Sequence, residues 1–430
     1  MSGLPGPPLW RLPTLGARAI RRPHEVALTL FRSYGPVVRL SLSPYVYLFG
    51  REANEMILST QAEDFTWREA LISLEPIDGP TALVLSDGEV HKRRRRLVQP
   101  AFATRRIDAA VPIIVEEVDR IIDALEVAET LDIYQAYRGV VRRIVTRVLF
   151  GSALAGQADR LGEVLEPAIR FVDRPPQFQF PGSPGRRPAR RARHEADRIV
   201  DAELARRRRS NDYGEDVLGV LLASDLTDAE ARDQVVSLIA AGYDTTSAAV
   251  AWTVLEVLRH PEVCARTRQE IRDRLGDSRA PGPDDLRAMP YLTAVVNEAL
   301  RLWPPGALSG RRAGRPVEYA GHVIPEGSIV LYSAYVTHRD PSLWGEDADR
   351  FRPERWFNNE LPPYSFVPFG GSYRRCIGFA LALAEVQVTL TRLLQRAGLR
   401  LTDPHRTVRG VGLSALRPDG GVGVTVETLR

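Results

Sequence analysis

The sequence predicts a mainly helical fold with small β-sheets near both ends of the chain. Apolar residues recur at helical spacing almost without interruption from Asp87 to Asp273,. Short segments with the alternating pattern of strands occur at Gly35 to Phe49, at Val317 to Ser333 and at Gly412 to Thr428,. No internal repeat or linker divides the 430 residues. We therefore expect a single domain, residues 1–430.

In the first half of the chain, residues 1–22 form an arm rich in Pro, Gly and Arg. The arm has no secretory core and no apolar run near the roughly 20 residues that a membrane span needs. Gly35 to Phe49 predicts two short strands, and Arg51 to Thr60 predicts a helix,. We expect the long helical region to break at Gly151 and at the proline-rich segment Pro175 to Pro188,.

In the second half, Leu238 to Arg259 predicts an apolar helix, and another begins near Pro290 and ends at Pro304,. Ile377 to Leu394 predicts a buried helix,. The turn sequence Pro418-Asp419-Gly420-Gly421 predicts a hairpin between the last two strands,.

Cysteine usage and charge narrow the possible environments. The two cysteines, Cys264 and Cys376, exclude a disulfide framework and favour a cytoplasmic protein,. The formal net charge is +4, but ten arginines crowd Arg186 to Arg209. Such a run can bind nucleic acid or an anionic membrane. Interspersed Glu and Asp residues favour a solvated helix face instead.

Cys376 is the most informative candidate for a functional residue. It ends the run Phe369-Gly370-Gly371-Ser372-Tyr373-Arg374-Arg375-Cys376 and precedes the last predicted helix. Unpaired N–H groups at a helix N-terminus favour a thiolate, and glycines let the backbone approach a flat ligand. A lone cysteine at such a position is more often a buried structural residue.

The run resembles the cysteine-ligand signature of the cytochromes P-450, the haem-thiolate monooxygenases, written F-x-x-G-x-R-x-C-x-G. Phe369, Arg374, Cys376 and Gly378 match it in order and spacing. The resemblance implies one triangular fold and haem b with Cys376 as axial iron ligand. Ser372 stands where the family usually has glycine; if the position needs positive φ, the serine costs about 1 kcal/mol of strain.

The helix at Leu238 to Arg259 contains Ala240-Ala241-Gly242-Tyr243-Asp244-Thr245-Thr246. Its hydroxyls, carboxyl and glycine compete with a regular helix, so we expect it to be kinked and widened. The stretch resembles the family's A-G-x-[D/E]-T-T motif on the distal side of the haem. The resemblance implies that Thr245 hydrogen-bonds dioxygen, that Asp244 helps to deliver protons, and that Ala241 and Gly242 line the oxygen pocket.

A structural triad follows from two further segments. Glu298 and Arg301 are three residues apart on one helix, a spacing of little weight by itself,. The later run Phe351-Arg352-Pro353-Glu354-Arg355-Trp356 resembles the family's P-E-R-F segment. The resemblance implies a buried triad of Glu298, Arg301 and Arg355 that holds the loop below the haem.

The two haem propionates need cationic partners. His91 and Arg95 lie four residues apart on one predicted helix,. The resemblance places them at the propionates together with Arg311 and Arg374, and arginine suits carboxylates because its planar fork binds them in two places. We expect the other arginines of this run, Arg93, Arg94 and Arg96, to face outward, where they can dock an acidic redox partner.

The resemblance spans nearly the whole chain and implies a bacterial monooxygenase that inserts one oxygen atom of O2 into an apolar small molecule. No flavin or nicotinamide domain is recognisable, so we expect a ferredoxin and a ferredoxin reductase to supply electrons. We also expect a monomer with no transmembrane anchor and no nucleic-acid partner. Fatty acids, terpenoids, steroids and secondary-metabolite scaffolds are all compatible substrates. The expected pocket segments are Phe65 to Thr81, Phe171 to Pro181 and Gly306 to Gly310.

Two rival functions stay open at this point. A peroxide-driven haem-thiolate enzyme fits the Cys376 loop, although the Asp244-Thr245 pair argues against it because proton relay matters most when dioxygen is the oxidant. A non-catalytic protein that binds nucleic acid or membrane through its arginines requires several motif matches to be accidental.

Overall fold

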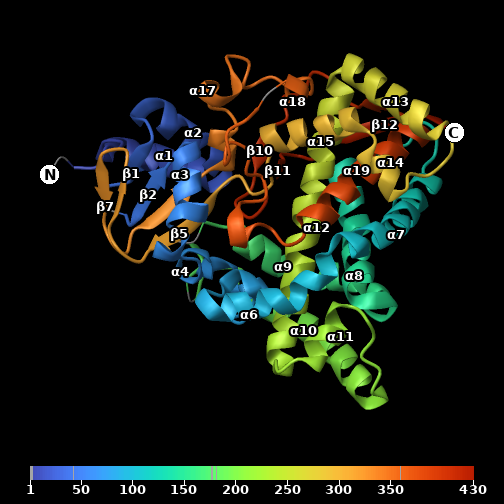
Figure 1. The fold of residues 1–430 in the computed structure, drawn as a ribbon, viewed down its shortest axis with the longest axis horizontal. Helices are drawn as coiled ribbons and strands as arrows, with labels where there is room; N and C mark the ends of the chain where they lie inside the picture. The colour runs from blue at the N-terminus through green and yellow to red at the C-terminus, as the bar shows by residue number, and fades with distance from the viewer. Residues whose placement is uncertain (1–2, 42, 176–177, 181, 359) are drawn as a thin grey trace.

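The computed structural model describes residues 3–41, 43–175, 178–180, 182–358 and 360–430. Helices dominate this part of the chain (Figure 1). They are α1 Leu12–Arg21, α2 Pro23–Tyr34, α3 Arg51–Glu55, α4 Arg68–Leu71, α5 Glu75–Asp78, α6 Gly88–Val98, α7 Thr104–Asp123, α8 Ile133–Ala155, α9 Ala158–Val172, α10 Arg186–Ser210, α11 Val217–Ala223, α12 Asp228–Arg259, α13 Pro261–Leu275, α14 Pro283–Arg287, α15 Pro290–Leu302, α16 Ala334–Thr337, α17 Pro341–Trp344, α18 Arg355–Asn358 and α19 Phe379–Arg396.

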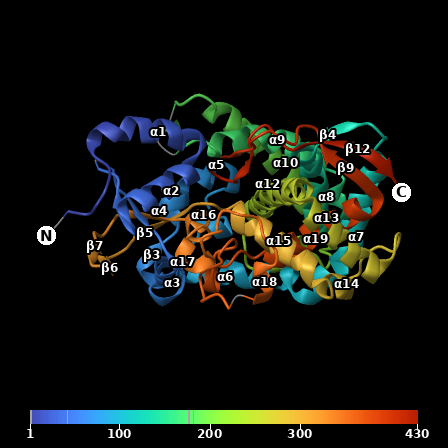
Figure 2. The same ribbon diagram turned by 90° about the horizontal axis from the view of Figure 1, so that it is seen from above.

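Short strands form small sheets at opposite ends of the molecule (Figure 2). The strands are β1 Val37–Arg39, β2 Tyr45–Leu48, β3 Phe65–Thr66, β4 Thr130–Asp132, β5 Ser309–Ala313, β6 Val317–Tyr319, β7 His322–Ile324, β8 Ile329–Tyr332, β9 Ala397–Leu401, β10 Gly410–Val411, β11 Arg417–Pro418 and β12 Gly423–Leu429. One sheet has the order β1-β2-β8-β5-β3, in which only β2 and β8 pair in parallel. A second has the order β4-β12-β9.

The helix α12 runs through the middle of the molecule and packs against α8, α10, α15 and α19 (Figures 1 and 2). Its start is fixed by a capping box, in which Thr227 and Glu230 each bond the other's backbone N–H,. Its residues contribute to both of the largest apolar clusters, one with α7, α15 and α19, the other with α9, α10 and α11. α12 therefore joins the two halves of the helical body.

The predicted helical architecture is confirmed, with some corrections at the level of elements. The helix after Cys376 begins at Phe379, two residues later than expected. The expected helix at Arg51 to Thr60 consists of α3 followed by a π-helical turn, Met56–Thr60. The predicted widening of α12 is wrong, because the helix is α-helical from Asp228 to Arg259.

The predicted C-terminal hairpin is also wrong. The turn has the expected geometry, with φ of 70° at Gly420 and 69° at Gly421. However, β11 before the turn pairs with β10, whereas β12 after it pairs with β4 and β9. Local turn chemistry predicted the reversal, but the partners of each strand depend on distant segments.

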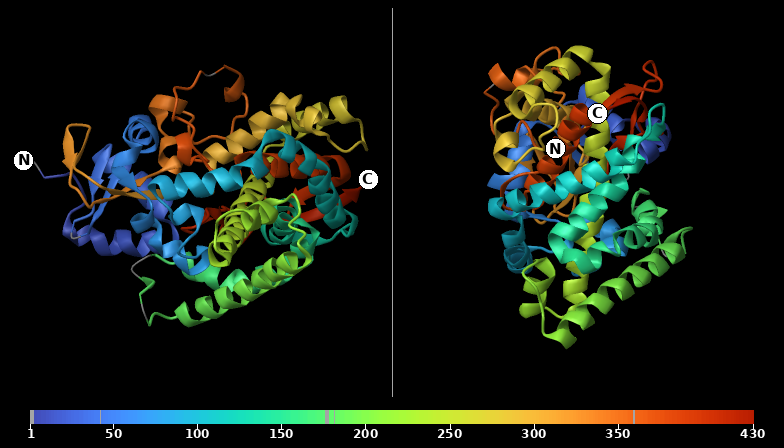
Figure 3. Two further views of the ribbon diagram at one scale, coloured as in Figure 1. Left: turned by 60° about the horizontal axis from the view of Figure 1, so that its bottom comes forward. Right: turned by 90° about the vertical axis from the view of Figure 1, so that its right-hand side faces the viewer.

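The arginine-rich helix α10 lies at the outer edge of the molecule (Figure 3). Several of its arginines form ion pairs with neighbouring carboxylates, including Arg193 with Asp197, Arg207 with Asp216 and Arg208 with Asp228. This arrangement fits the solvated-face interpretation. In the described part of the chain, no helix is long and apolar enough to cross a membrane.

Candidate functional site

The Cys376 loop is held in shape by its own backbone. The Cys376 N–H donates to the Phe369 carbonyl at 2.8 Å, and the Gly370 N–H donates to the Val367 carbonyl at 3.1 Å. Gly370 has a φ of 69°, a region that favours glycine,. At Gly371 an added Cβ would lie 3.0 Å from the ring of Tyr364, so a side chain there would crowd that ring. These constraints explain why the loop is rich in glycine.

Protein atoms crowd around Cys376, yet its side chain is accessible to solvent. Burial raises the pKa of the Cys376 thiol, while the Gly378 N–H and the guanidinium groups of Arg95 and Arg375 lower it. Burial has the larger effect, so helix-terminal N–H groups alone do not hold a thiolate here. A bound cation would favour the ionised sulfur, as metals do for coordinating thiols.

Ser372 has a φ of 53°, in the left-handed region. The strain expected for a serine at this position is therefore present, and its cost is about 1 kcal/mol. The side chain is exposed and fills no core space.

We predict that Ser372→Gly raises the free energy of unfolding by up to about 1 kcal/mol, because relief of left-handed strain exceeds the extra chain entropy of glycine. Denaturant unfolding of the purified protein measures this change. Ser372→Ala is the matched control, since it removes the hydroxyl and keeps the strain. Equal stabilities of the glycine and alanine variants would contradict the prediction.

Cationic groups gather beside this loop. Arg311 on β5 is 1% exposed and donates to the Tyr332 hydroxyl and the Ser309 hydroxyl, both at 2.9 Å. It has no carboxylate partner among the described residues, and burial lowers its pKa to about 10. The half-buried Arg95 likewise has no acidic partner in the described chain. Arg374 pairs with Asp87 at 2.7 Å.

His91 is the fourth member of this cluster. We expected it to carry a positive charge, and the structure indicates otherwise. Burial, together with Arg374 and Arg95, lowers the pKa of His91 to about 4. The imidazole is therefore neutral near pH 7, and its Nδ1 is buried with no hydrogen-bond partner in the described structure. It can offer one hydrogen bond to an anion without contributing charge.

Trp67 and Asp87 belong to the same site and were missed by the motif analysis. The Trp67 ring lies 3.2 Å from the Arg311 guanidinium carbon and 4.8 Å from that of Arg374. Asp87 accepts hydrogen bonds from the Trp67 backbone N–H at 3.0 Å and from Arg374. A tryptophan and an aspartate 20 residues apart carry no sequence signal, because only the fold brings them together.

On α12, two predicted residues present open surface although the helix crosses the middle of the molecule. Ala241 is exposed and Thr245 is half-buried. The Thr245 hydroxyl donates to the Ala241 carbonyl at 2.7 Å. This bond satisfies the hydroxyl within the helix and explains how a threonine is accommodated without widening it.

Gly242 lies on the side of α12 that faces α8. A Cβ at this position would lie 3.1 Å from Cγ2 of Val145 on α8. The missing side chain therefore allows close packing of α12 on α8. The space predicted for oxygen does not lie on the α8 side of Gly242.

Asp244 also faces α8. Its Oδ1 accepts a hydrogen bond from the Tyr134 hydroxyl at 2.6 Å and lies 3.3 Å from Nε of Arg138. The carboxylate is 6% exposed. Thr245 and Asp244 are adjacent in sequence, yet they are engaged with different neighbours.

The predicted triad is assembled as a buried network. Glu298 and Arg301 are 0% exposed and Arg355 is 3% exposed. Glu298 accepts from Arg301 at 2.8 and 2.9 Å and from Arg355 at 2.8 Å. The backbone N–H of Arg352 and the indole of Trp356 complete its shell.

The arginines of the triad extend it to distant loops. Arg301 donates to the carbonyls of His338 and Arg350, and Arg355 donates to that of Trp344. His338, which we expected not to be a ligand, accepts from the Val367 N–H at 2.9 Å through Nε2. The network therefore reaches the segment that leads into the Cys376 loop.

Comparisons with known proteins point to one family. The family model described as Cytochrome P450 matches residues 3–419. The chain is 40% identical over 422 residues to cytochrome P450 139 of Mycobacterium tuberculosis, covering 94% of this chain and 97% of the relative. It is 33% identical to cyclooctat-9-en-7-ol 5-monooxygenase of Streptomyces melanosporofaciens, covering 74% of this chain and 72% of the relative. The solved structure of retinoic acid-bound cyanobacterial CYP120A1 superimposes with a TM-score of 0.85 at 27% identity, covering 100% of both chains.

Proposed function

Because the chain belongs to the cytochrome P450 family of haem-thiolate monooxygenases, we propose that it holds haem b through Cys376 and oxygenates an apolar ring compound. The observation that carries this proposal is the buried cation cluster beside the Cys376 loop. Arg311 and Arg95 have no acidic partner in the described chain, and two propionates would supply the missing charge,. Arg374 and the neutral His91 are the other proposed contacts.

Haem held by a cysteine thiolate activates dioxygen when it is reduced, because the thiolate donates electron density that favours O–O cleavage. The protein's own contribution is positioning and proton supply. We assign Thr245 to hydrogen bonding on the open side of α12, beside the exposed Ala241. Asp244 carries protons toward that side from the polar groups of α8.

Electrons come from a separate acidic carrier of the ferredoxin type. Arg375, which precedes Cys376, and Arg96 on α6 are exposed and lack a carboxylate partner in the described residues. Such charges steer an acidic partner. The expectation of an outward-facing side chain is wrong for Arg94, which is buried against Glu230 at 2.8 Å. Arg93 is 42% exposed and pairs with Asp225 at 2.5 Å.

The proposed substrate class is supported by two relatives. One relative is named for oxygenating cyclooctat-9-en-7-ol, and the structural relative was solved with retinoic acid bound. Both compounds contain a carbon ring; one is an alcohol and the other a carboxylic acid. Phe178 and Phe180, 44% and 55% exposed, offer apolar surface in a predicted pocket segment; Pro175 and Gln179 lie in the same segment, whereas residues 176, 177 and 181 fall outside the described chain.

The function is tested by assaying the haem-loaded enzyme with ferredoxin, ferredoxin reductase and a panel of cyclic terpenoids and retinoids. We expect a thiolate-type carbon monoxide band, a spin-state shift with at least one compound, and oxygen-dependent product. Turnover with peroxide but none with dioxygen and ferredoxin would support the peroxide-driven rival.

We predict that Asp244→Asn lowers the rate of product formation by about 10²-fold, because an amide cannot pick up and release the proton. Product formation and oxygen consumption with saturating substrate measure the effect. Asp228→Asn is the control on the same helix, at an exposed pair with Arg208. An Asp244→Asn enzyme with the wild-type rate would contradict the assignment.

A further inference from the structure

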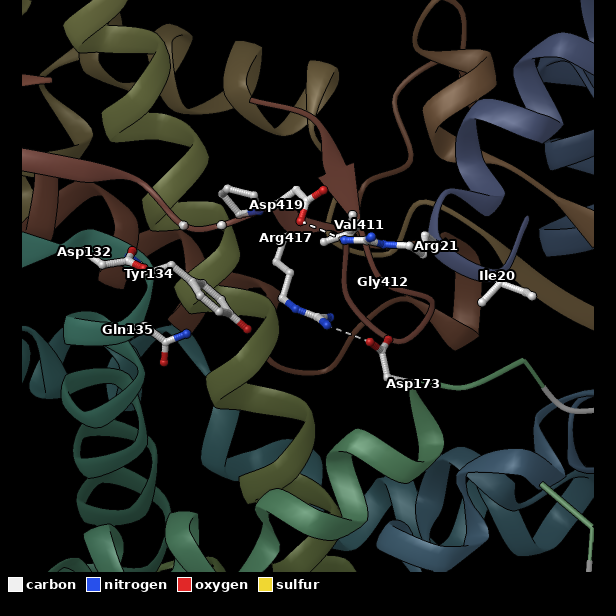
Figure 4. A pocket seen from close by; sticks show the side chains of 13 residues that line it. Ile20, Arg21, Asp132, Tyr134, Gln135, Asp173, Val411, Gly412, Arg417 and Asp419 are labelled. Atoms are coloured by element: carbon white, nitrogen blue, oxygen red, sulfur yellow. Dashed lines mark hydrogen bonds and ion pairs between the residues drawn. The ribbon is translucent and has the colours of Figure 1, made fainter. Parts of the chain in front are cut away.

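A polar cavity of about 470 Å³ is lined by Tyr134 and Arg417 among others (Figure 4). Its walls come from four parts of the chain: the end of α1, the start of α8, the residue that follows α9, and the β10–β11 segment. Gln135 and Gly420 line it and are exposed, so the cavity reaches bulk water.

Charged side chains make this cavity suitable for water. Arg417 pairs with Asp173 at 2.8 Å, and Arg21 pairs with Asp419 at 3.3 Å, both drawn in Figure 4. Asp132 accepts from the backbone N–H groups of Tyr134 and Val422. Because these charged groups already have partners, they do not form a site that is selective for one anion or cation. Water fits such a lining of mixed charge.

Tyr134 connects the cavity to Asp244. Its side chain lines the cavity and is 5% exposed, and its hydroxyl donates to Oδ1 of Asp244 at 2.6 Å. A hydroxyl both donates and accepts, so a water in the cavity can donate to the phenol oxygen while the phenol donates to the carboxylate. Burial and the neighbouring carboxylate raise the pKa of Tyr134 above its ordinary value, which keeps the phenol protonated.

The surrounding charges keep this connection in place. Arg138 lies 3.3 Å from Asp244 and is held by Glu166 at 2.7 Å. Arg417, from β11, faces both Tyr134 and Asp244. Tyr243 packs on the other side, with the Arg138 guanidinium 5.4 Å from its ring.

We propose that this cavity supplies protons to the monooxygenase and that Tyr134 is the positioning residue that passes them to Asp244. A proton from bulk solvent reaches a cavity water, which passes a proton to the phenol oxygen as the phenol proton moves to Asp244. One proton enters, and both the water and the tyrosine end neutral. Asp244 then turns toward the Thr245 side and releases the proton. The inference rests on the proposed role of Asp244.

The test compares Tyr134→Phe with Tyr137→Phe in the haem-loaded enzyme. Tyr137 lies on the same helix, is 1% exposed, and its hydroxyl has no partner in the described structure, so it is a matched control. We expect Tyr134→Phe to lower product formation about tenfold and to enlarge the solvent deuterium isotope effect. The substrate spin-state titration and the carbon monoxide band should be unchanged. Tyr137→Phe should match the wild type in all four measurements.

Gln135→Trp provides a second variant that leaves the core intact, because Gln135 is exposed at the cavity. We expect the same direction of change with a smaller loss of rate. Wild-type rate and isotope effect in both Tyr134→Phe and Gln135→Trp, together with a slow Asp244→Asn, would overturn the route and leave the proposed function standing. Loss of the carbon monoxide band or of turnover in the wild type would instead refute the proposed function.

Discussion

Glu298→Ala will yield protein that does not retain haem and that has lost about 3–5 kcal/mol of its free energy of unfolding. The substitution leaves the guanidinium groups of Arg301 and Arg355 buried without their carboxylate. It also removes the acceptor for the Arg352 N–H and the Trp356 indole. The loops that these arginines hold lead to the Cys376 loop, so their loosening displaces the proposed iron ligand.

Denaturant unfolding and the ratio of haem to protein absorbance measure both effects. Glu354→Ala is the control, because Glu354 directly precedes Arg355 and its side chain is 46% exposed. It accepts hydrogen bonds from Arg266 and Tyr291. We expect it to cost under about 1 kcal/mol and to retain haem. Recovery of stable, fully haem-loaded Glu298→Ala protein would refute the structural role of the triad.

The second large effect is expected at Cys376. Cys376→Ala removes the proposed axial sulfur while leaving Arg95, Arg311 and Arg374 in place to hold the propionates. The protein should bind haem more weakly, show no thiolate-type carbon monoxide band and lose monooxygenase turnover, because no other group can supply the same electron donation.

Cys264→Ala is the matched control for this experiment. Cys264 is the other cysteine of the chain, lies on α13 and is half-buried. It should keep the band and the rate of the wild type. A thiolate-type band that survives in Cys376→Ala and disappears in Cys264→Ala would reverse the assignment of the ligand.

Several features were predictable because each depends on neighbours in sequence. Helical periodicity predicted α15 to within two residues of its observed limits, since proline starts it and a proline pair follows it. The positive φ of Ser372 was predictable because this serine stands at the position where the loop signature usually has glycine. The turn at Gly420 and Gly421 was predictable from their conformational freedom,.

Features that depend on packing between distant segments were not predicted. The direction of Gly242 toward Val145 and the burial of Arg94 against Glu230 each reflect neighbours from another helix. The neutral state of His91 reflects its burial together with the nearby Arg374 and Arg95. A run of four arginines looks uniform in sequence, but successive helical positions face different surroundings.

The sequence by itself determined the family, the helical architecture and the identity of the proposed ligand, because motif spacing and apolar periodicity are local properties of the chain. Only the tertiary structure decided that Asp244 faces Tyr134 and Arg138 and that Trp67 lies against Arg311 and Arg374. The physical reason is that burial and charge come from groups that the fold brings together across more than 100 residues. These long-range contacts set the hydrogen bonds and ion pairs on which the chemistry of the site depends.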